Sequence, residues 1–335
     1  NRDDVLRDKY KEIVDVFKEM FDINLDVVDN GGDATELKIR ISKEKYFLNL
    51  DKCGAGIFEN LFMITNLCDA QDRIFFIEEP EQHLHPHAQK ILGNFLEVAA
   101  KDNQLLLTTH SLIFADPKYF EKIRLVRWDA STKINFVDKD ILRPEDIQKL
   151  KMELEDYSKR NIFFSRGALL VDGSTELGAF PQFIKKMNFS FEMKGLLIIS
   201  CDGSNSYPLF SRLSASLKIP CFSIFDKDAF KLKSFGAVFN ISKVEWKNIE
   251  ESSEEKINTE YASRGAYLLP GNFETTLEID GFKSEHDKYM CRNHGNKRIS
   301  GTLLAEELVG KCIIPPTFEK ALNAAIEYFK KTNTQ

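Results

Sequence analysis

The amino-acid sequence predicts an α/β protein built from two successive units. Two observations lead to this prediction: apolar strands alternate with amphipathic helical stretches, and the alternation occurs twice along the chain. A length of 335 residues suits about two domains of the usual size, roughly 100 to 200 residues each. A hydrophobic fraction of 43% and a charged fraction of 29% argue against a disordered or collagen-like chain.

The first unit is expected to begin with an amphipathic helix over residues 3–20, where apolar positions recur at helical spacing. Polar and apolar residues then alternate in two runs, 24–28 and 36–41. With the joining residues 29–33, these runs predict a hairpin or short meander. Further apolar strands and a helix, typical of a parallel sheet covered by helices, follow at 74–77, 88–99, 105–108 and 123–128.

A charged amphipathic segment, residues 144–159, predicts a connecting helix between the units, which is assigned to residues 144–165. The second alternation has strands at 168–171, 196–200 and 220–225, with helices at 177–186 and 207–217. An amphipathic helix at 317–331 is explained by packing alone. The predicted domains are therefore 1–143 and 166–335, joined by 144–165.

The composition of the chain limits the kinds of partner and the cellular environment that we expect for it. With 46 basic and 52 acidic residues the net charge is -6, so contact with a nucleic acid has to be local or mediated by metal ions. The six cysteines form no CxxC pair, which argues against a zinc ribbon or a disulfide framework. No apolar run approaches the roughly 18 residues of a membrane span, so a cytoplasmic protein is expected. Because the chain begins at Asn1 without a methionine, we expect a fragment of a longer protein.

The first chemical motif lies at the ends of two predicted strands. Glu78 and Glu79 follow the first strand, and His110 follows the second. In nucleoside triphosphatases one acid at such a strand end holds water on Mg²⁺ and the next activates the attacking water, which are the roles expected of Glu78 and Glu79. His110 is placed where it could hydrogen-bond a γ-phosphate. The alternative is a Glu-Glu-Pro sequence that merely ends a strand.

This order of motifs resembles the RecF/SMC/ABC-type ATPases, with a Walker B strand, a D-loop at residues 81–86 and an H-loop histidine. The resemblance places Gly54 and Gly56 in the signature motif, before a helix whose N-terminus could hold phosphate. It implies the C-terminal half of an ABC/SMC-like ATPase domain. No G-x-x-x-x-G-K-[ST] phosphate loop occurs in these residues. We therefore expect the Walker A half upstream of Asn1 or on another chain, ATP at a composite site, and no ATP hydrolysis by this polypeptide alone.

Three closely spaced histidines, His83, His85 and His87, allow a second interpretation of the same region, a zinc site. Zinc sites usually draw further ligands from elsewhere in the chain. The other nearby histidine, His110, already has a role in the ATPase interpretation. The zinc site is thus the weaker alternative.

The second chemical motif is a set of acids at strand ends in the second unit. Asp172 and Glu176 flank a glycine turn that opens a helix, and Asp226 and Asp228 follow a later strand. Open α/β sheets bind ligands at the carboxyl ends of their strands. Converging carboxylates repel one another, and a bound divalent cation commonly neutralises this repulsion. Mg²⁺ is favoured because its ligands are oxygens. Two such ions could assist phosphodiester cleavage. A solvated loop without metal is the alternative for Asp226 and Asp228.

The arrangement resembles the TOPRIM domain, a Rossmann-like parallel sheet that here has a helical C-terminal part. Downstream of an ABC-type ATPase half it resembles the OLD (overcoming lysogenisation defect) nucleases, which include antiphage effectors such as the Gabija nuclease. The resemblance makes Glu176 the second acid of the turn, Asp226 and Asp228 the Asp-x-Asp pair, and Glu274 a further metal ligand. Lys297 matches the family's late lysine, which would stabilise charge on the scissile phosphate.

Asp172 departs from the family pattern, which has glutamate at this position. Its shorter side chain withdraws the carboxylate by one methylene, and this could turn direct ligation into ligation through water. Asp202, after the intervening strand, is either an outer ligand or a turn former, and the turn is favoured. Lys227, Lys231 and Lys233 could meet a DNA backbone or form a solvated face.

The resemblance implies a Mg²⁺- or Mn²⁺-dependent DNA endonuclease, regulated by an ABC-type ATPase module in antiphage defence. It also implies a homodimer or higher oligomer, and allows a partner protein from a defence system. The alternative is a non-catalytic regulatory module that senses ATP, dimerises and carries an inactive TOPRIM domain. A topoisomerase or primase fragment ranks last, because none of the nine tyrosines stands in a nucleophile's context.

Overall fold

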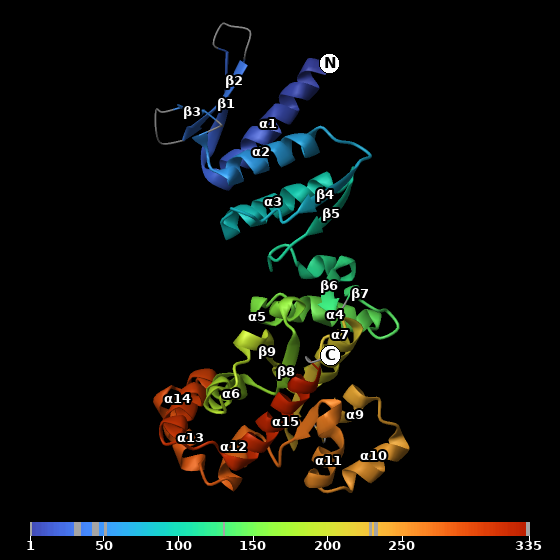
Figure 1. Cartoon of the computed structure of the whole chain (residues 1–335), viewed down its shortest axis with the longest axis vertical. Coiled ribbons are helices and arrows are strands. Elements are labelled where there is room, and N and C mark those ends of the chain that lie inside the picture. The colour runs from blue at the N-terminus through green and yellow to red at the C-terminus, as the bar shows by residue number, and fades with distance from the viewer. Residues whose placement is uncertain are drawn as a thin grey trace. The chain divides into compact units, whose positions relative to one another are not determined.

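The computed structural model describes residues 2–29, 35–41, 47–49, 52–129, 131–227, 230 and 234–332. The chain divides into two compact units, residues 1–116 and 117–335 (Figure 1). Both are α/β structures, and the second contains a four-stranded parallel sheet. The predicted fold class is therefore confirmed. Within the described residues, none of the helices is both long and apolar enough to cross a membrane.

The first unit opens with α1 (Arg2–Phe21), as the helical periodicity predicts. An antiparallel meander follows, in the order β1 (Ile23–Asp29), β2 (Thr35–Ile41) and β3 (Phe47–Asn49). The predicted hairpin strands are thus confirmed. The turn expected between them, residues 30–34, lies outside the described residues.

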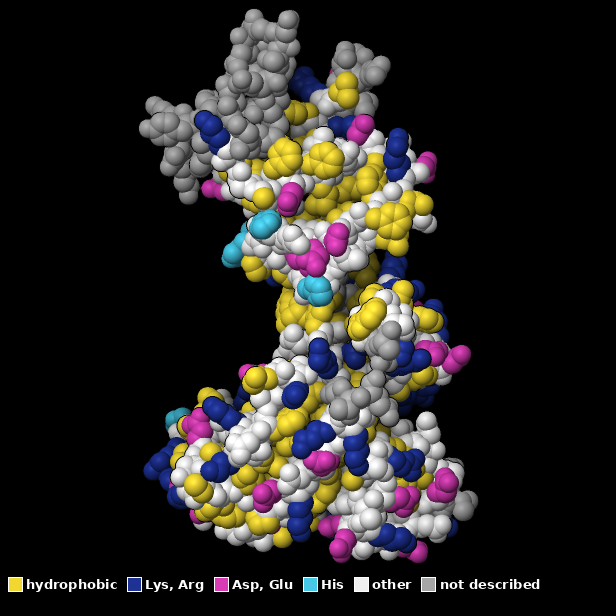
Figure 2. Space-filling view, viewed as in Figure 1, with side chains coloured by type: hydrophobic (Ala, Val, Ile, Leu, Met, Phe, Trp, Pro, Cys, Tyr) yellow, Lys and Arg dark blue, Asp and Glu magenta, His cyan; other side chains and the backbone are white. Residues whose placement is uncertain are grey.

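A parallel pair of strands carries the first motif. β4 (Ile74–Glu78) and β5 (Gln104–Thr108) pair along their whole length, and α3 (Pro86–Ala99) connects them. The core of the unit is formed by α1, α3 and α2 (Ala55–Cys68), with the fully buried side chains of Phe17, Ile64 and Leu92. Alternate strand residues point away from this core, and Phe76 is 80% exposed. Apolar side chains gather on the face of the unit that Figure 2 shows.

One predicted strand pairs differently from the expectation. β6 (Arg124–Asp129) was placed in the parallel sheet by the sequence pattern, but it pairs antiparallel with β7 (Ser131–Phe136) in a separate two-stranded sheet. The cause is local, because the next run of alternating residues begins at Ser131. Parallel pairing of the two runs would need a long crossover connection between them, usually a helix, and the chain has none there. The pairs Val126–Ile134 and Trp128–Thr132 form one exposed face of this hairpin.

The connecting segment contains two helices rather than one. α4 (Pro144–Glu153) ends at Glu153, and α5 (Tyr157–Arg160) begins after Asp156. The Asp156 side chain accepts a hydrogen bond from the Ser158 backbone N–H at 2.8 Å. This helix cap starts a new helix and explains why the amphipathic pattern is interrupted.

The parallel sheet of the second unit has the order β11-β10-β8-β9. β8 (Gly167–Val171) lies at its centre and is buried along its whole length, between β10 (Cys221–Phe225) and β9 (Leu196–Ser200). The short strand β11 (Ala266–Leu268) pairs with β10. All pairings are parallel, so the carboxyl ends of β8, β9 and β10 share one edge, as the sequence predicts.

Helices connect and cover these strands. α6 (Ser174–Lys186) follows β8 and α7 (Tyr207–Ser216) follows β9, close to the predicted bounds. Between β10 and β11 the described chain forms α9 (Ser234–Phe239), α10 (Lys243–Glu250) and α11 (Glu254–Tyr261). The rest of the unit is helical, in α12 (Phe273–Ile279), α13 (Lys283–Arg292), α14 (Lys297–Gly310) and α15 (Pro316–Thr332).

Two glycines allow α14 to cross α6 at very short range. A Cβ atom on Gly178 of α6 would lie 2.2 Å from the Arg298 carbonyl oxygen, and one on Gly301 of α14 would lie 2.3 Å from the Thr175 carbonyl oxygen. Neither position has room for a side chain. The crossing fixes the first turns of α14 beside the first turns of α6.

Candidate functional site

Four acids of the second unit lie at the carboxyl edge of the parallel sheet. Asp172 follows β8, Asp226 follows β10, and Glu176 lies in the first turn of α6. Glu274 lies in the first turn of α12, the helix that follows β11. The strand order brings together residues that are far apart in the sequence.

The other three carboxylates act electrostatically on that of Glu176. Glu176 is only 6% exposed, and burial raises its pKa from 4.5 to about 7. The carboxylates of Asp172, Glu274 and Asp226 raise the pKa further by repulsion, while a hydrogen bond with the backbone of Glu176 lowers it. Asp226 is 7% exposed. A set of like charges that includes two buried carboxylates favours a cation or a proton.

The donor chemistry fits Mg²⁺ or Mn²⁺, because the converging groups are all carboxylate oxygens and repel one another without a cation. Within the described residues, no three histidine, cysteine, aspartate or glutamate side chains form a group that could hold a metal ion by themselves. Mg²⁺ commonly uses only one or two carboxylates and completes its shell with waters and substrate phosphates. The predicted ligand Asp228 lies outside the described residues, as do Lys231 and Lys233.

Lys297 is the first residue of α14, directly after the helix cap Asn296, and its side chain is exposed. Because Gly178 and Gly301 bring α14 against α6, the first turn of α14 lies on the helix that carries Glu176. The fold therefore places this lysine on an element next to the acids.

Asp202 forms a turn, which was the favoured sequence interpretation. Its backbone has a φ of 48°, in the left-handed region, and its carboxylate is ion-paired with Lys159 at 2.7 Å. Sequence reasoning missed Lys159, which is separated from Asp202 in the sequence by β8, α6 and β9. The sequence carries no signal for this lysine, because its burial and its contact with Asp202 depend on the tertiary structure.

The acids of the first unit lie at the end of β4. Glu78 is exposed at the last position of the strand, and Glu79 has a left-handed backbone with a φ of 43°. Oε1 of Glu79 lies 3.4 Å from Nε2 of His110, and Oε2 accepts a hydrogen bond from the Gln82 amide at 2.7 Å. The structure thus brings Glu79 and His110 together, from the ends of two adjacent strands.

Glu81 is a further residue of this edge that the sequence analysis did not single out. Its Oε1 atom accepts hydrogen bonds from the Thr109 hydroxyl at 2.7 Å, the His110 backbone N–H at 2.6 Å and the Ser111 backbone N–H at 3.0 Å. These bonds tie the segment after β4 to the segment after β5. Glu81 therefore holds the backbone of His110 in place.

Gly54 and Gly56 lie at the start of α2, with Gly54 as its cap residue. A Cβ atom on Gly56 would lie 2.7 Å from Cβ of His83, so the start of α2 packs directly against residues 81–86. His85 caps α3 through Nδ1, which accepts a 3.3 Å hydrogen bond from the His87 backbone N–H. The described residues thus give His85 a structural role, and the three histidines do not form a group that could hold a metal.

Comparison with known proteins identifies two domain families. Residues 2–115 match the AAA ATPase domain, and residues 163–228 match the TOPRIM domain of overcoming lysogenization defect protein-like proteins. The second match includes the positions of Asp172, Glu176, Asp226 and Asp228.

Two curated proteins are similar over most of the chain. An OLD nuclease from Thermus scotoductus is 25% identical over 277 residues, which are 79% of this chain and 52% of that protein. Endonuclease GajA from Bacillus cereus is 23% identical over 293 residues, covering 75% of this chain and 38% of that protein. The chain therefore spans about half, or less, of the length of the curated relatives it matches.

Among solved structures, the C-terminal region of the Xanthomonas campestris OLD protein aligns with a TM-score of 0.41 at 18% identity, over 51% of this chain and 95% of that one. The sequence matches place an ATPase region before a TOPRIM region, in the order that the motifs predict. The chain is thus similar to the OLD nucleases and matches an AAA-type ATPase domain followed by an OLD-like TOPRIM domain.

Proposed function

We propose that this chain provides the nuclease site of a Mg²⁺- or Mn²⁺-dependent DNA endonuclease. The observation that carries the proposal is the buried carboxylate of Glu176, whose pKa is raised to about 7 by burial and by Asp172, Glu274 and Asp226. A cluster of carboxylates favours a divalent cation, and this one lies at the sheet edge where α/β proteins bind ligands. Named nucleases among the relatives support the reaction class.

In this proposal Asp172, Glu176, Asp226, Asp228 and Glu274 hold the metal ions. The bound ions would supply Lewis acidity and a hydroxide-like nucleophile. The protein's own contribution is to bring the acids together, to exclude bulk water from Glu176, and to orient the DNA phosphate against them. Lys297, on the first turn of α14, would stabilise negative charge on that phosphate.

The first unit is proposed to regulate the nuclease through ATP at a composite site, with Glu78, Glu79 and His110 at the γ-phosphate and Gly54 and Gly56 in the signature segment. The contact between Glu79 and His110 supports these roles. A parallel sheet is normally covered on both faces, and Phe76 on β4 is 80% exposed. The exposed side of β4 therefore supports the proposal that a further segment or chain covers this sheet and completes the ATPase. Homodimerisation, a role in antiphage defence and a protein partner follow from the family resemblance.

Nicking of supercoiled plasmid tests the proposal. The chain is incubated with Mg²⁺ or Mn²⁺, and the conversion to open circles is followed for the wild type and for Asp226→Ala. We expect nicking by the wild type, none by the variant, and an unchanged circular dichroism spectrum. Equal nicking by both proteins would refute the assigned site. Absence of metal binding by the wild type would instead favour the non-catalytic regulatory module. The observation that supports this alternative is Asp172, whose side chain is shorter than the glutamate of the family pattern.

A further inference from the structure

Lys159 joins two distant segments of the second unit. Its side chain is 9% exposed, and Nζ lies 2.5 Å from Oε2 of Glu153, at the end of α4, and 2.7 Å from Oδ2 of Asp202, after β9. Burial lowers the pKa of Lys159, but the hydrogen bonds to Asp202 and Glu153 outweigh this effect and the pKa lies above its ordinary value. Burial likewise raises the pKa of Asp202, but Lys159 and Ser200 bring it below its ordinary value. The pair is therefore charged at neutral pH.

The turn that contains Asp202 has a backbone that needs support. Asp202 has a φ of 48° and Gly203 a φ of 116°, and the left-handed region is unfavourable for a residue with a Cβ atom. The Ser200 hydroxyl donates a hydrogen bond to Oδ1 of Asp202 at 2.7 Å, and the Asp202 N–H donates to the Ser200 hydroxyl at 3.3 Å. Lys159 occupies the other carboxylate oxygen, so both oxygens of Asp202 are held.

This turn is attached directly to the end of β8. The Cys201 N–H donates to the Val171 carbonyl at 2.8 Å, and the Gly203 N–H donates to the Asp172 carbonyl at 3.1 Å. The backbone of Asp172 is thus fixed by the turn that Lys159 and Ser200 hold. Asp172 in turn is one of the carboxylates that act on Glu176.

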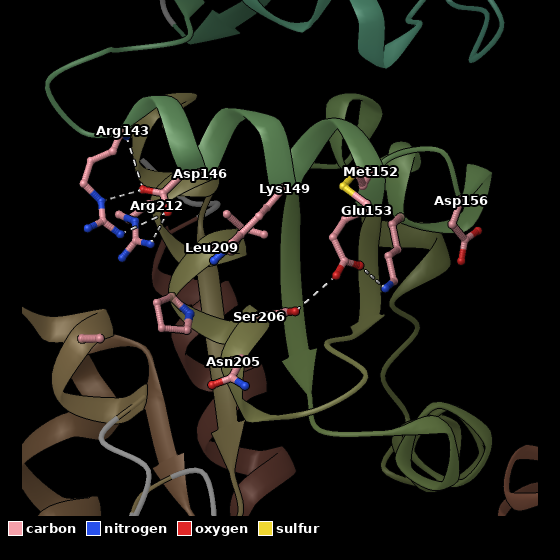
Figure 3. Close-up of a pocket in the computed structure, with 13 residues that line it drawn as sticks. Arg143, Asp146, Lys149, Met152, Glu153, Asp156, Asn205, Ser206, Leu209 and Arg212 are labelled. Carbon is pink, nitrogen blue, oxygen red and sulfur yellow. Dashed lines mark hydrogen bonds and ion pairs between the residues drawn. The ribbon is translucent and has the colours of Figure 1, made fainter.

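The other end of the ion pair faces a cavity. A hollow of about 790 Å³ is lined by residues of α4, of α7 and of the turn before α7, among them Glu153, Lys149 and Ser206 (Figure 3). The Ser206 hydroxyl donates a 3.3 Å hydrogen bond to Oε1 of Glu153. Lys159 also lies before residue 163, where the match to the OLD-like TOPRIM domain begins. The lysine therefore links the connecting segment to the edge of the TOPRIM sheet.

We propose that Lys159 is a positioning residue for the carboxylate site: by holding Asp202, it fixes the turn of residues 201–203 and with it the backbone of Asp172. The inference rests on the proposed metal-binding role of that site. It gains weight from the identity of Asp172, because an aspartate has one rotatable bond fewer than a glutamate. A displaced aspartate backbone is therefore harder to compensate by a change of rotamer.

Titration calorimetry with Mn²⁺ alone tests the inference on the full 335-residue chain. We expect Lys159→Met to weaken Mn²⁺ binding by about 10-fold or more, the usual effect of removing a residue that orients a metal ligand. Lys149→Met is the matched control, since Lys149 lies on α4, lines the same cavity and is exposed. Its Mn²⁺ affinity is expected to equal that of the wild type.

A second variant separates positioning from a purely structural role. Lys159→Met leaves Glu153 and Asp202 without their shared counter-charge, so its melting temperature is expected to fall. In Lys159→Met/Glu153→Gln one of these charges is removed and the melting temperature should rise again. The Mn²⁺ affinity should remain weak, because Asp202 is still not held by the lysine.

Three results would overturn the inference: wild-type Mn²⁺ affinity in Lys159→Met, recovery of the affinity together with the melting temperature in the double variant, or no Mn²⁺ binding by the wild type. A wild-type chain that binds Mn²⁺ and shows the expected variant effects, but does not nick DNA, would refute the proposed nuclease function and leave the role of Lys159 standing.

Discussion

Replacing Glu176 by glutamine should stabilise the metal-free protein at alkaline pH while it removes a proposed metal ligand. Below pH 4.5 the carboxyl is protonated in both folded and unfolded states, so it carries no penalty. Between 4.5 and about 7 the unfolded chain ionises while the folded chain retains the proton, and stability falls as pH rises. Above about 7 the folded state carries the full cost of a buried charge.

The size of this cost follows from the same pKa. The interval from 4.5 to about 7, at about 1.4 kcal/mol for each pH unit, corresponds to a cost on the order of 3 kcal/mol. Glu176→Gln keeps the shape of the side chain and cannot ionise. We therefore expect the variant to be more stable than the wild type by a few kcal/mol at pH 8 in EDTA, and by almost nothing at pH 4.5.

Urea denaturation followed by tryptophan fluorescence is the assay, because both tryptophans, Trp128 and Trp246, lie in the second unit. The control is Glu192→Gln, an exposed glutamate of the same unit, for which no pH-dependent difference is expected. Excess Mn²⁺ should stabilise the wild type more than Glu176→Gln. A variant that is no more stable than the wild type at pH 8 would refute the electrostatic description of the site.

Two further predictions concern helix packing and ATP. Gly301→Ala should destabilise the second unit by about 1–3 kcal/mol and reduce nicking, because its Cβ atom would lie 2.3 Å from a carbonyl oxygen of α6. The control is Gly310→Ala on the same helix, where an added Cβ atom would meet open space, so the change should be neutral or stabilising by up to about 1 kcal/mol. Equal melting temperatures for the two variants would contradict the close crossing of α6 and α14. Phosphate release should show no ATP turnover by these 335 residues, which contain no phosphate loop, and turnover that Glu79→Gln abolishes would refute this.

The strands and the position of the acids could be predicted from the sequence because both are local properties. An apolar run that ends in carboxylates places those carboxylates at a strand end, and β8 and β10 have their predicted positions. Parallel pairing then follows from the intervening helices. The same reasoning failed for β6, since periodicity does not reveal which partner a strand chooses.

The supporting contacts could not be predicted because they depend on tertiary structure. Lys159 and Asp202 are in contact although β8, α6 and β9 lie between them in the sequence. Gly178 and Gly301 appear in the sequence merely as poor helix formers, and only the crossing of α6 and α14 explains them. The helix break before α5 could have been predicted, because Asp156 is a common type of helix cap.

Binding of Mn²⁺ to the wild-type chain and to Asp226→Ala, measured by calorimetry at pH 8, tests most directly whether the four neighbouring acids form a metal centre. The account predicts saturable binding by the wild type and a loss of at least about 10-fold in affinity for the variant, because Asp226 is one of the buried carboxylates around Glu176. Identical titrations for the two proteins, or no heat of binding for the wild type, would contradict it.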